Sequence, residues 1–257
     1  MLKIRIIPTL LWKDTGLVKG KGFDSWRRVG TVLPAIKVYN TRDVDELILV
    51  DIAATKSKKD PDYDEIQNLT AESFVPLTVG GGIHSIEQIT RILRAGADKI
   101  TLNSVAYENP NLVSEAVKKF GSQCVVVSID AKNSTGHEFE CYSHSGSQAR
   151  GLSVVDHARH MQNLGAGEIL LTSIERDGTM TGYDLALIKA VSRAVTIPVI
   201  ASGGAGNYQH MLEALEAGAS AVAAAAIFHF TEQTPIEARK FLADHGIPVR
   251  SSHRGES

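Results

Sequence analysis

The chain has 257 residues, 43% of them hydrophobic, and is therefore long enough for one large domain with a buried core. Its net charge of −2 excludes the strongly basic surface that is typical of nucleic-acid or anionic-membrane binding. No stretch approaches the roughly 20 apolar residues of a membrane span, and the N-terminus does not resemble a signal peptide.

Short apolar runs alternate with amphipathic segments along the chain. The runs, typical of strands in a buried parallel sheet, lie at residues 4–10, 47–52, 76–79, 100–103, 124–129, 169–172, 198–201 and 221–226. The amphipathic segments, typical of helices, include 86–93, 112–120, 154–164, 185–194, 210–217 and 235–242. This alternation predicts an α/β fold, a (β/α)8 TIM barrel over residues 1–250, followed by a polar tail at 251–257. An open doubly wound sheet is the competing fold, but no G-x-G-x-x-G follows the first strand.

A long segment rich in glycine and lysine, at residues 14–29, follows the first strand. We expect a mobile loop that carries Lys19 and closes over a substrate, which would exclude water. An idle surface loop has the same composition and is the alternative.

The sequence contains an internal repeat. Gly81-Gly82 begins a helix that leads into the strand at 100–103, and Gly203-Gly204 begins a helix that leads into the strand at 221–226. The second glycines of the two copies, Gly96 and Gly218, follow at the same interval. Because the copies are four strands apart, the repeat predicts two similar half-barrels; chance similarity of two βαβ units is the alternative.

Both glycine pairs lie between a strand and a helix. Free N–H groups and the positive end of the helix dipole attract anions at such a position. Asn103-Ser104 and Ala226-Ile227 follow the partner strands and would complete two phosphate cradles. Opposite cradles imply a substrate with a phosphate at each end, unless the glycines only permit tight turns.

Asp130 ends the fifth strand, and a carboxylate at the C-terminal end of a barrel strand is well placed for acid–base chemistry. The alternative is an exposed aspartate or a cap for the next turn. Asp51, Thr172, Asp177 and Ser202 lie at comparable positions, and we expect them to line the same mouth.

A second polar set is expected at the N-terminal mouth. Period-two alternation puts Arg5 on the same face as Leu11, about 20 Å away at roughly 3.3 Å per residue. Glu46, Lys99 and Glu168 occupy the corresponding early position of the second, fourth and sixth strands. We expect a ring of alternating charge, which either gates a channel through the barrel or only stabilises this end.

The remaining polar residues predict little chemistry. Cys124 and Cys141 lack CxxC spacing, which argues against a disulfide framework and fits a cytoplasmic protein. The nine histidines show no metal-binding spacing, so we expect no metal site, and no motif predicts a cofactor.

Six stretches of the chain are distinctive: PLTVGGGI (76–83), GSQCVVV (121–127), GAGEILLTS (165–173), RDGT (176–179), VIASGGAG (199–206) and IFHF (227–230). Together they resemble the cyclase subunit of imidazole glycerol phosphate synthase, with a likeness that runs from about residue 4 to 250. The resemblance implies a half-barrel duplication and a substrate with two phosphates. It also implies a glutaminase docked on the N-terminal face, from which ammonia passes through the barrel.

The resemblance also implies roles by position. Asp130 matches one of two catalytic acids, the other acid falls on Leu11, and Lys19 matches a lid lysine. The ammonia gate matches Arg5, Glu46, Lys99 and Glu168, and the glutaminase interface matches Asp98 and Gln123. Phosphate contacts fall on Gly82, Asn103, Ser104, Asp177, Gly178, Gly203 and Gly204.

Leu11 is the informative departure from this pattern, beside Ala226 in place of a serine. A positioned acid typically supplies a factor of roughly 10²–10⁴ in rate, and leucine cannot supply it. The Leu10-Leu11 pair resembles a divergent branch of the family that is linked to amidino-sugar formation for surface polysaccharides.

We therefore expect a cyclase-type subunit that binds a glutaminase and a phosphorylated small molecule and delivers ammonia to another acceptor, together with a downstream sugar-modifying enzyme. One alternative is an ordinary histidine-pathway cyclase, which converts the phosphoribulosyl-formimino carboxamide nucleotide and ammonia to imidazole glycerol phosphate and AICAR. A second is a non-catalytic barrel that activates a glutaminase. The related isomerase would not need the charged ring.

Overall fold

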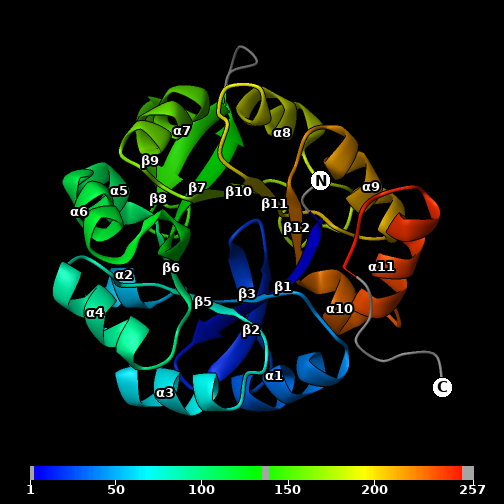
Figure 1. The fold of residues 1–257 in the computed structure, drawn as a ribbon, viewed down its shortest axis with the longest axis horizontal. Helices are drawn as coiled ribbons and strands as arrows, with labels where there is room; N and C mark the ends of the chain where they lie inside the picture. Colours follow the sequence, from blue (N-terminus) through cyan, green and yellow to red (C-terminus); the bar gives the residue numbers. More distant parts are fainter. Residues whose placement is uncertain (1–2, 135–138, 251–257) are drawn as a thin grey trace.

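A computed structural model describes residues 3–134 and 139–250, in which eight parallel strands close into a barrel surrounded by helices (Figure 1). The barrel strands are β1 (Arg5–Lys13), β4 (Leu47–Asp51), β5 (Leu77–Gly80), β6 (Lys99–Leu102), β7 (Val125–Asn133), β10 (Glu168–Ser173), β11 (Val199–Ser202) and β12 (Ala221–Ala224). Pairing of β7 with β10 closes the ring. The predicted (β/α)8 fold is confirmed, whereas the tail predicted at 251–257 lies outside the described residues.

The barrel strands are buried on both faces. On β4, for example, Leu47, Ile48 and Leu49 are all fully buried, because Ile48 faces the barrel interior while its neighbours pack against the helices. Such strands appear in sequence as continuous apolar runs, which is why the eight runs were recognisable.

Helices cover the outside of the barrel. They are α1 (Val32–Thr41), α2 (Ala54–Ser57), α3 (Tyr63–Ala71), α4 (Ile86–Arg94), α5 (Ser104–Glu108), α6 (Asn111–Phe120), α7 (Val154–Asn163), α8 (Leu185–Ser192), α9 (Tyr208–Glu216), α10 (Ala226–Phe230) and α11 (Pro235–Asp244), with a 3-10 turn at Ser122–Cys124. Several begin at side-chain caps, as where Ser85 accepts from the Gln88 N–H and Asn207 from the His210 N–H. Among the described residues no helix is long and apolar enough to cross a membrane.

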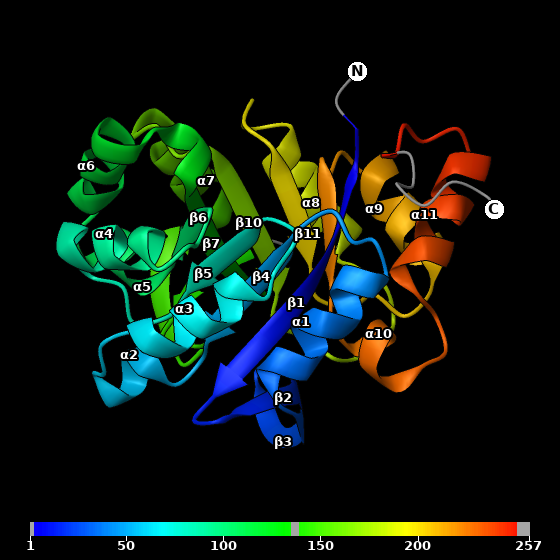
Figure 2. The ribbon, with the colours of Figure 1, turned by 60° about the horizontal axis from the view of Figure 1, so that its bottom comes forward.

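The prediction that residues 14–29 form a loop is wrong. This segment is a β-hairpin of β2 (Gly16–Lys21) and β3 (Asp24–Gly30), and β2 pairs antiparallel with an extended β1. Figure 2 shows the hairpin at the C-terminal end of β1. Leu17 and Val18 are buried in it, and tertiary pairing of this kind overrides a loop-like composition.

A second hairpin was not predicted. It consists of β8 (Phe139–Ser143) and β9 (Gln148–Ser153) and pairs with the end of β7, which extends to Asn133 for that reason. Both hairpins project from the C-terminal ends of barrel strands, where they surround the mouth.

The two copies of the sequence repeat adopt the same local structure. In each, a glycine pair with positive φ leads through a capped helix, α4 or α9, to a strand and then to a short helix, α5 or α10. The copies lie on opposite sides of the barrel, because β5 and β11 are separated by four steps of the strand order.

Candidate functional site

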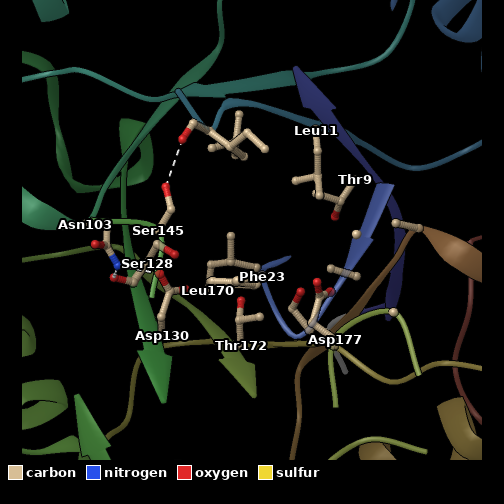
Figure 3. A pocket seen from close by; sticks show the side chains of 18 of the residues that line it. Thr9, Leu11, Phe23, Asn103, Ser128, Asp130, Ser145, Leu170, Thr172 and Asp177 are labelled. Atoms are coloured by element: carbon tan, nitrogen blue, oxygen red, sulfur yellow. Dashed lines mark hydrogen bonds between the residues drawn. The ribbon is translucent and has the colours of Figure 1, made fainter. Parts of the chain in front are cut away.

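A cavity that is open to solvent occupies the C-terminal end of the barrel (Figure 3). The residues predicted for the site that line it are Leu11, Lys19, Asp51, Asn103, Ser104, Asp130, Thr172, Asp177, Gly178, Ser202, Gly203, Gly204 and Ala226. Gly82 does not line it; the neighbouring Gly81 does. Within the described part of the chain no cluster of acids, histidines or cysteines is arranged to hold a metal ion.

Asp130 is buried in the wall of this cavity, on β7. Its Oδ2 accepts a hydrogen bond from Asn103 Nδ2 at 3.1 Å, and the same amide donates to Ser128 O at 3.1 Å. Burial raises the pKa of Asp130 to about 7; the negative charge of Asp177 adds to the rise and the Asn103 hydrogen bond opposes it. A carboxyl group that titrates near neutral pH can both accept and donate a proton.

The raised pKa of Asp130 predicts a pH-dependent cost to stability. Between its usual pKa and about 7 the folded state binds more protons at this group than the unfolded state, so the Asp130 contribution falls as pH rises. In Asp130→Asn we expect this loss to disappear, so that the variant gains stability relative to the native chain between pH 5 and 8. Urea unfolding at both pH values measures the difference, and an equal difference at both would contradict the assigned pKa.

Lys19 and Asp177 form a second pair of titratable groups. Lys19 is buried and donates from Nζ to Thr9 O at 3.0 Å. Burial lowers the pKa of Lys19 to about 8, against the opposing charge of Asp177, and burial raises the pKa of Asp177 to about 6, against the opposing charge of Lys19. The cavity therefore holds three groups that titrate between about 6 and 8.

The hairpin that carries Lys19 is held against the loop that carries Asp177. Gly22 N donates to Asp177 O at 2.9 Å, and a Cβ added to Gly178 would lie 2.2 Å from Gly20 O. This close backbone contact positions Lys19 and Asp177 in the same part of the cavity, although they are far apart in sequence.

Leu11 lies across the cavity from Asp130, on the opposite strand of the barrel (Figure 3). Its half-buried side chain contributes an apolar surface at the position where the family resemblance implies an acid. Around Asp130 the other strand ends are polar: Thr172 pairs in register with both Asp130 and Ser202.

The glycine turns allow close approach of the backbone on two sides of the cavity. Gly81 has φ of +108°, and an added Cβ would lie 2.2 Å from Asp51 O. Gly203 has φ of +87°, and an added Cβ would lie 2.7 Å from Ser173 O. Only glycine fits these positions without strain, because the backbone of a neighbouring strand end already takes the space that a side chain would need. Asp51 itself accepts from Ala53 N and Ala54 N, and so caps the turn into α2.

The predicted charged ring is present at the N-terminal end of the barrel. Arg5 bonds to Glu46 at 2.7 Å and to Glu168 at 2.8 Å, and Lys99 Nζ lies 3.0 Å from each of these carboxylates. Thr78 Oγ1 also donates to Glu46 at 2.8 Å. Burial lowers the pKa of Arg5, but the two carboxylates raise it overall; burial raises the pKa of Glu168, but Arg5 and Lys99 hold it below its usual value. Both shifts favour the charged forms of Arg5 and Glu168.

An apolar layer separates the ring from the cavity. It consists of inward-facing side chains of β1, β4, β7, β10, β11 and β12: Ile7, Ile48, Val126, Leu170, Ile200, Ala221 and Ala223. Leu170 and Ala223 also line the floor of the cavity. The charged ring, the apolar layer and the cavity floor therefore follow one another through the barrel.

Asp98 and Gln123 lie at the N-terminal face, before β6 and β7, and both are exposed. Asp98 Oδ2 accepts from Leu77 N at 2.9 Å, and Gln123 Nε2 donates to Phe120 O at 3.1 Å. The two side chains are thus on the same face as the ring and accessible to a partner.

Sequence reasoning missed part of the cavity wall. Phe23 and Trp26 from the first hairpin and Ser145 from the second line the mouth, where Ser145 Oγ donates to Ile52 O at 2.9 Å. Phe23 and Gly146 bring the two hairpin tips together, since a Cβ on Gly146 would lie 2.9 Å from the Phe23 ring. In the sequence, Gly22 and Gly146 indicate turns at these two positions. They do not indicate that the turns lie over the cavity.

Comparison with protein families gives one result that bears on this site. A family model described as a histidine biosynthesis protein matches residues 5–234. The matched range begins at Arg5 of the ring and includes all the cavity residues discussed above.

Proposed function

Because the chain belongs to the histidine biosynthesis protein family of barrel enzymes, we propose that it is a cyclase-type subunit that receives ammonia from a glutaminase. The glutaminase docks on the N-terminal face near Asp98 and Gln123. Ammonia enters through the ring and reaches the cavity, which binds a phosphorylated acceptor. The acceptor differs from the nucleotide of histidine synthesis, as it would in amidino-sugar formation, because Leu11 replaces a catalytic acid.

The charged ring is the observation that carries this proposal. Arg5, Glu46, Lys99 and Glu168 are joined by four ion pairs at the end of the barrel away from the cavity, and in this proposal ammonia passes when one of these pairs separates. An isomerase that binds its substrate at the C-terminal mouth would not need an ammonia gate at the other end.

The apolar layer above the ring supports the same reading. Moving an ion through such a layer is costly because burial of an unpaired charge is strongly unfavourable, whereas neutral ammonia pays only for its lost hydrogen bonds. The small side chains of Ala221 and Ala223 reduce the bulk of this layer beside β12. The arrangement favours neutral ammonia over ammonium.

An ordinary histidine-pathway cyclase is the second candidate. It is favoured by Asp177, a further carboxyl group in the cavity whose charge raises the pKa of Asp130. In this reading Asp177 supplies the proton transfer that Leu11 cannot.

Complex formation with the glutaminase subunits encoded in the same genome tests the proposed function. We expect one of them to form a stable complex with this chain and to hydrolyse glutamine faster within it, as measured by size-exclusion chromatography with light scattering and by glutamate release. Asp98→Ala should weaken the complex. The matched control is Asp64→Ala, an exposed carboxylate in the first turn of α3 at the opposite face. Absence of a complex with every such glutaminase would contradict the proposal.

A further inference from the structure

The side chain of Leu11 faces the cavity and is not part of the core. It is half-buried, lines the cavity, and belongs to neither of the two apolar clusters that the described residues form. Its register partner on β4 is Val50, which also lines the cavity, so the two side chains lie next to each other on the wall. Apolar surface that is left in contact with water is unfavourable. The Leu11–Val50 pair is therefore a small apolar patch that an apolar group of a ligand would cover.

A hydroxyl group without a partner lies beside this patch. Thr9 precedes Leu11 by two residues on β1, so both side chains are on the same face of the strand, and Figure 3 shows them directed into the cavity together. Thr9 is only 9% exposed, and its Oγ1 has no hydrogen-bond partner among the described residues. Buried hydroxyl groups are almost always hydrogen-bonded. A ligand with a polar group next to its apolar group would supply the missing bond.

The opposite wall of the cavity is polar. Asp130 on β7 and Thr172 on β10 are register partners, as Leu11 and Val50 are on β1 and β4. Each of these pairs lies four steps of the strand order from the other, which is directly across the closed barrel. A ligand that spans the cavity therefore meets hydrogen-bonding groups on one side. On the other side it meets an apolar patch with one hydroxyl.

An acetamido group matches the chemistry of the β1–β4 wall. Its amide has one donor and one acceptor, and the Thr9 hydroxyl can pair with either. Its methyl group is small enough to be covered by two side chains, Leu11 and Val50. A charged ammonium or carboxylate group at the same place would lose its hydration against these two side chains without gaining an opposite charge.

We propose that Thr9, Leu11 and Val50 form a subsite for the acetamido group of the acceptor. This inference rests on the proposed function for the identity of the acceptor as a phosphorylated sugar. The methyl group lies on Leu11 and Val50, the amide hydrogen-bonds to Thr9, and the far side of the sugar faces Asp130 and Thr172. Leu11 is then a residue that determines specificity, and its presence is more than the loss of an acid.

Three sugar phosphates that differ in a single substituent provide the probes. They are N-acetylglucosamine 1-phosphate, its N-formyl analogue, which lacks only the methyl group, and glucose 1-phosphate, which lacks the amide. In isothermal titration calorimetry with the full chain, we expect the acetyl compound to bind roughly 10-fold more tightly than the formyl compound, because one methyl group in an apolar pocket contributes at least about this factor. Glucose 1-phosphate should bind most weakly.

Variants of the three residues assign the effect to the subsite. Leu11→Asp and the nearly isosteric Val50→Thr should each reduce the preference for acetyl over formyl. Thr9→Val should weaken the binding of both amides and keep the preference between them. The matched control is Leu152→Asp, at a residue of β9 that is 46% exposed and is not part of the cavity wall; it should bind all three compounds as the native chain does.

Three results would overturn the proposal. They are equal affinities of the native chain for the acetyl and formyl compounds, no binding of any of the three compounds, and a full acetyl preference in both Leu11→Asp and Val50→Thr. Since the titration uses no glutaminase, its outcome is independent of the docking assay. A glutaminase complex without an acetyl preference would leave the proposed function standing and remove only the acetamido subsite.

Discussion

Leu11→Asp is expected to raise ammonia-dependent cyclisation of the phosphoribulosyl-formimino carboxamide nucleotide by a factor of about 10²–10⁴. The native cavity has Asp130, Lys19 and the glycine turns but an apolar side chain opposite Asp130. A carboxylate at position 11 restores a proton-transfer group on the strand that faces Asp130. Steady-state turnover with the purified chain and ammonium salt, without a glutaminase, measures the gain.

Leu11→Asn separates acid–base chemistry from polarity at this position. It has nearly the shape of the aspartate variant but cannot transfer a proton, so we expect it to remain as slow as the native chain. If the native chain turns over the nucleotide as fast as Leu11→Asp does, it is a histidine-pathway cyclase and delivery to another acceptor is wrong. If neither variant is active, the cavity has diverged in more than this one side chain.

Glu46→Ala is expected to lower the free energy of unfolding by about 3–5 kcal/mol. Glu46 is only 2% exposed and accepts bonds from Arg5, Lys99 and Thr78. Its removal leaves two partly buried cations with Glu168 as their remaining partner in the ring. Such uncompensated buried charge is far more costly than the loss of a surface pair.

Urea unfolding of native and variant chains measures this change. The matched control is Glu72→Ala, which removes a carboxylate paired with Lys37 at 3.2 Å where both side chains are about half exposed. Surface pairs contribute at most about 1 kcal/mol, so the control should be close to native. Equal effects of the two substitutions would show that the ring is solvated like the surface and does not close the barrel.

Much of the ring and of the cavity was predictable because the relevant information is local. Three of the ring residues, Glu46, Lys99 and Glu168, stand at the start of apolar runs that are recognisable as strands. In parallel strands that are in register, residues at corresponding positions lie at the same level of the barrel, and these three therefore meet. Asp130 was found for a similar reason, since it follows a continuous apolar run whose C-terminal end must lie at the mouth of a barrel.

The parts that were not predicted depend on contacts between distant segments. The β2–β3 hairpin has the composition of a loop, and its strands form because β1 offers an edge beyond the barrel. Gly81, and not Gly82, lines the cavity wall, where its backbone lies close to Asp51 O. The spacing of residues in the sequence does not reveal this contact.

The hydrogen bond from Gly22 N to Asp177 O links the position of Lys19 to the position of the first hairpin at the cavity mouth. Any outward movement of this hairpin breaks the bond and removes Lys19 from Asp177 and from Thr9 O. The same movement exposes the cavity to bulk water, which returns both charged groups toward their ordinary pKa values. The perturbed pKa values of Lys19 and Asp177 therefore depend on the contact between the hairpin and the loop that carries Asp177.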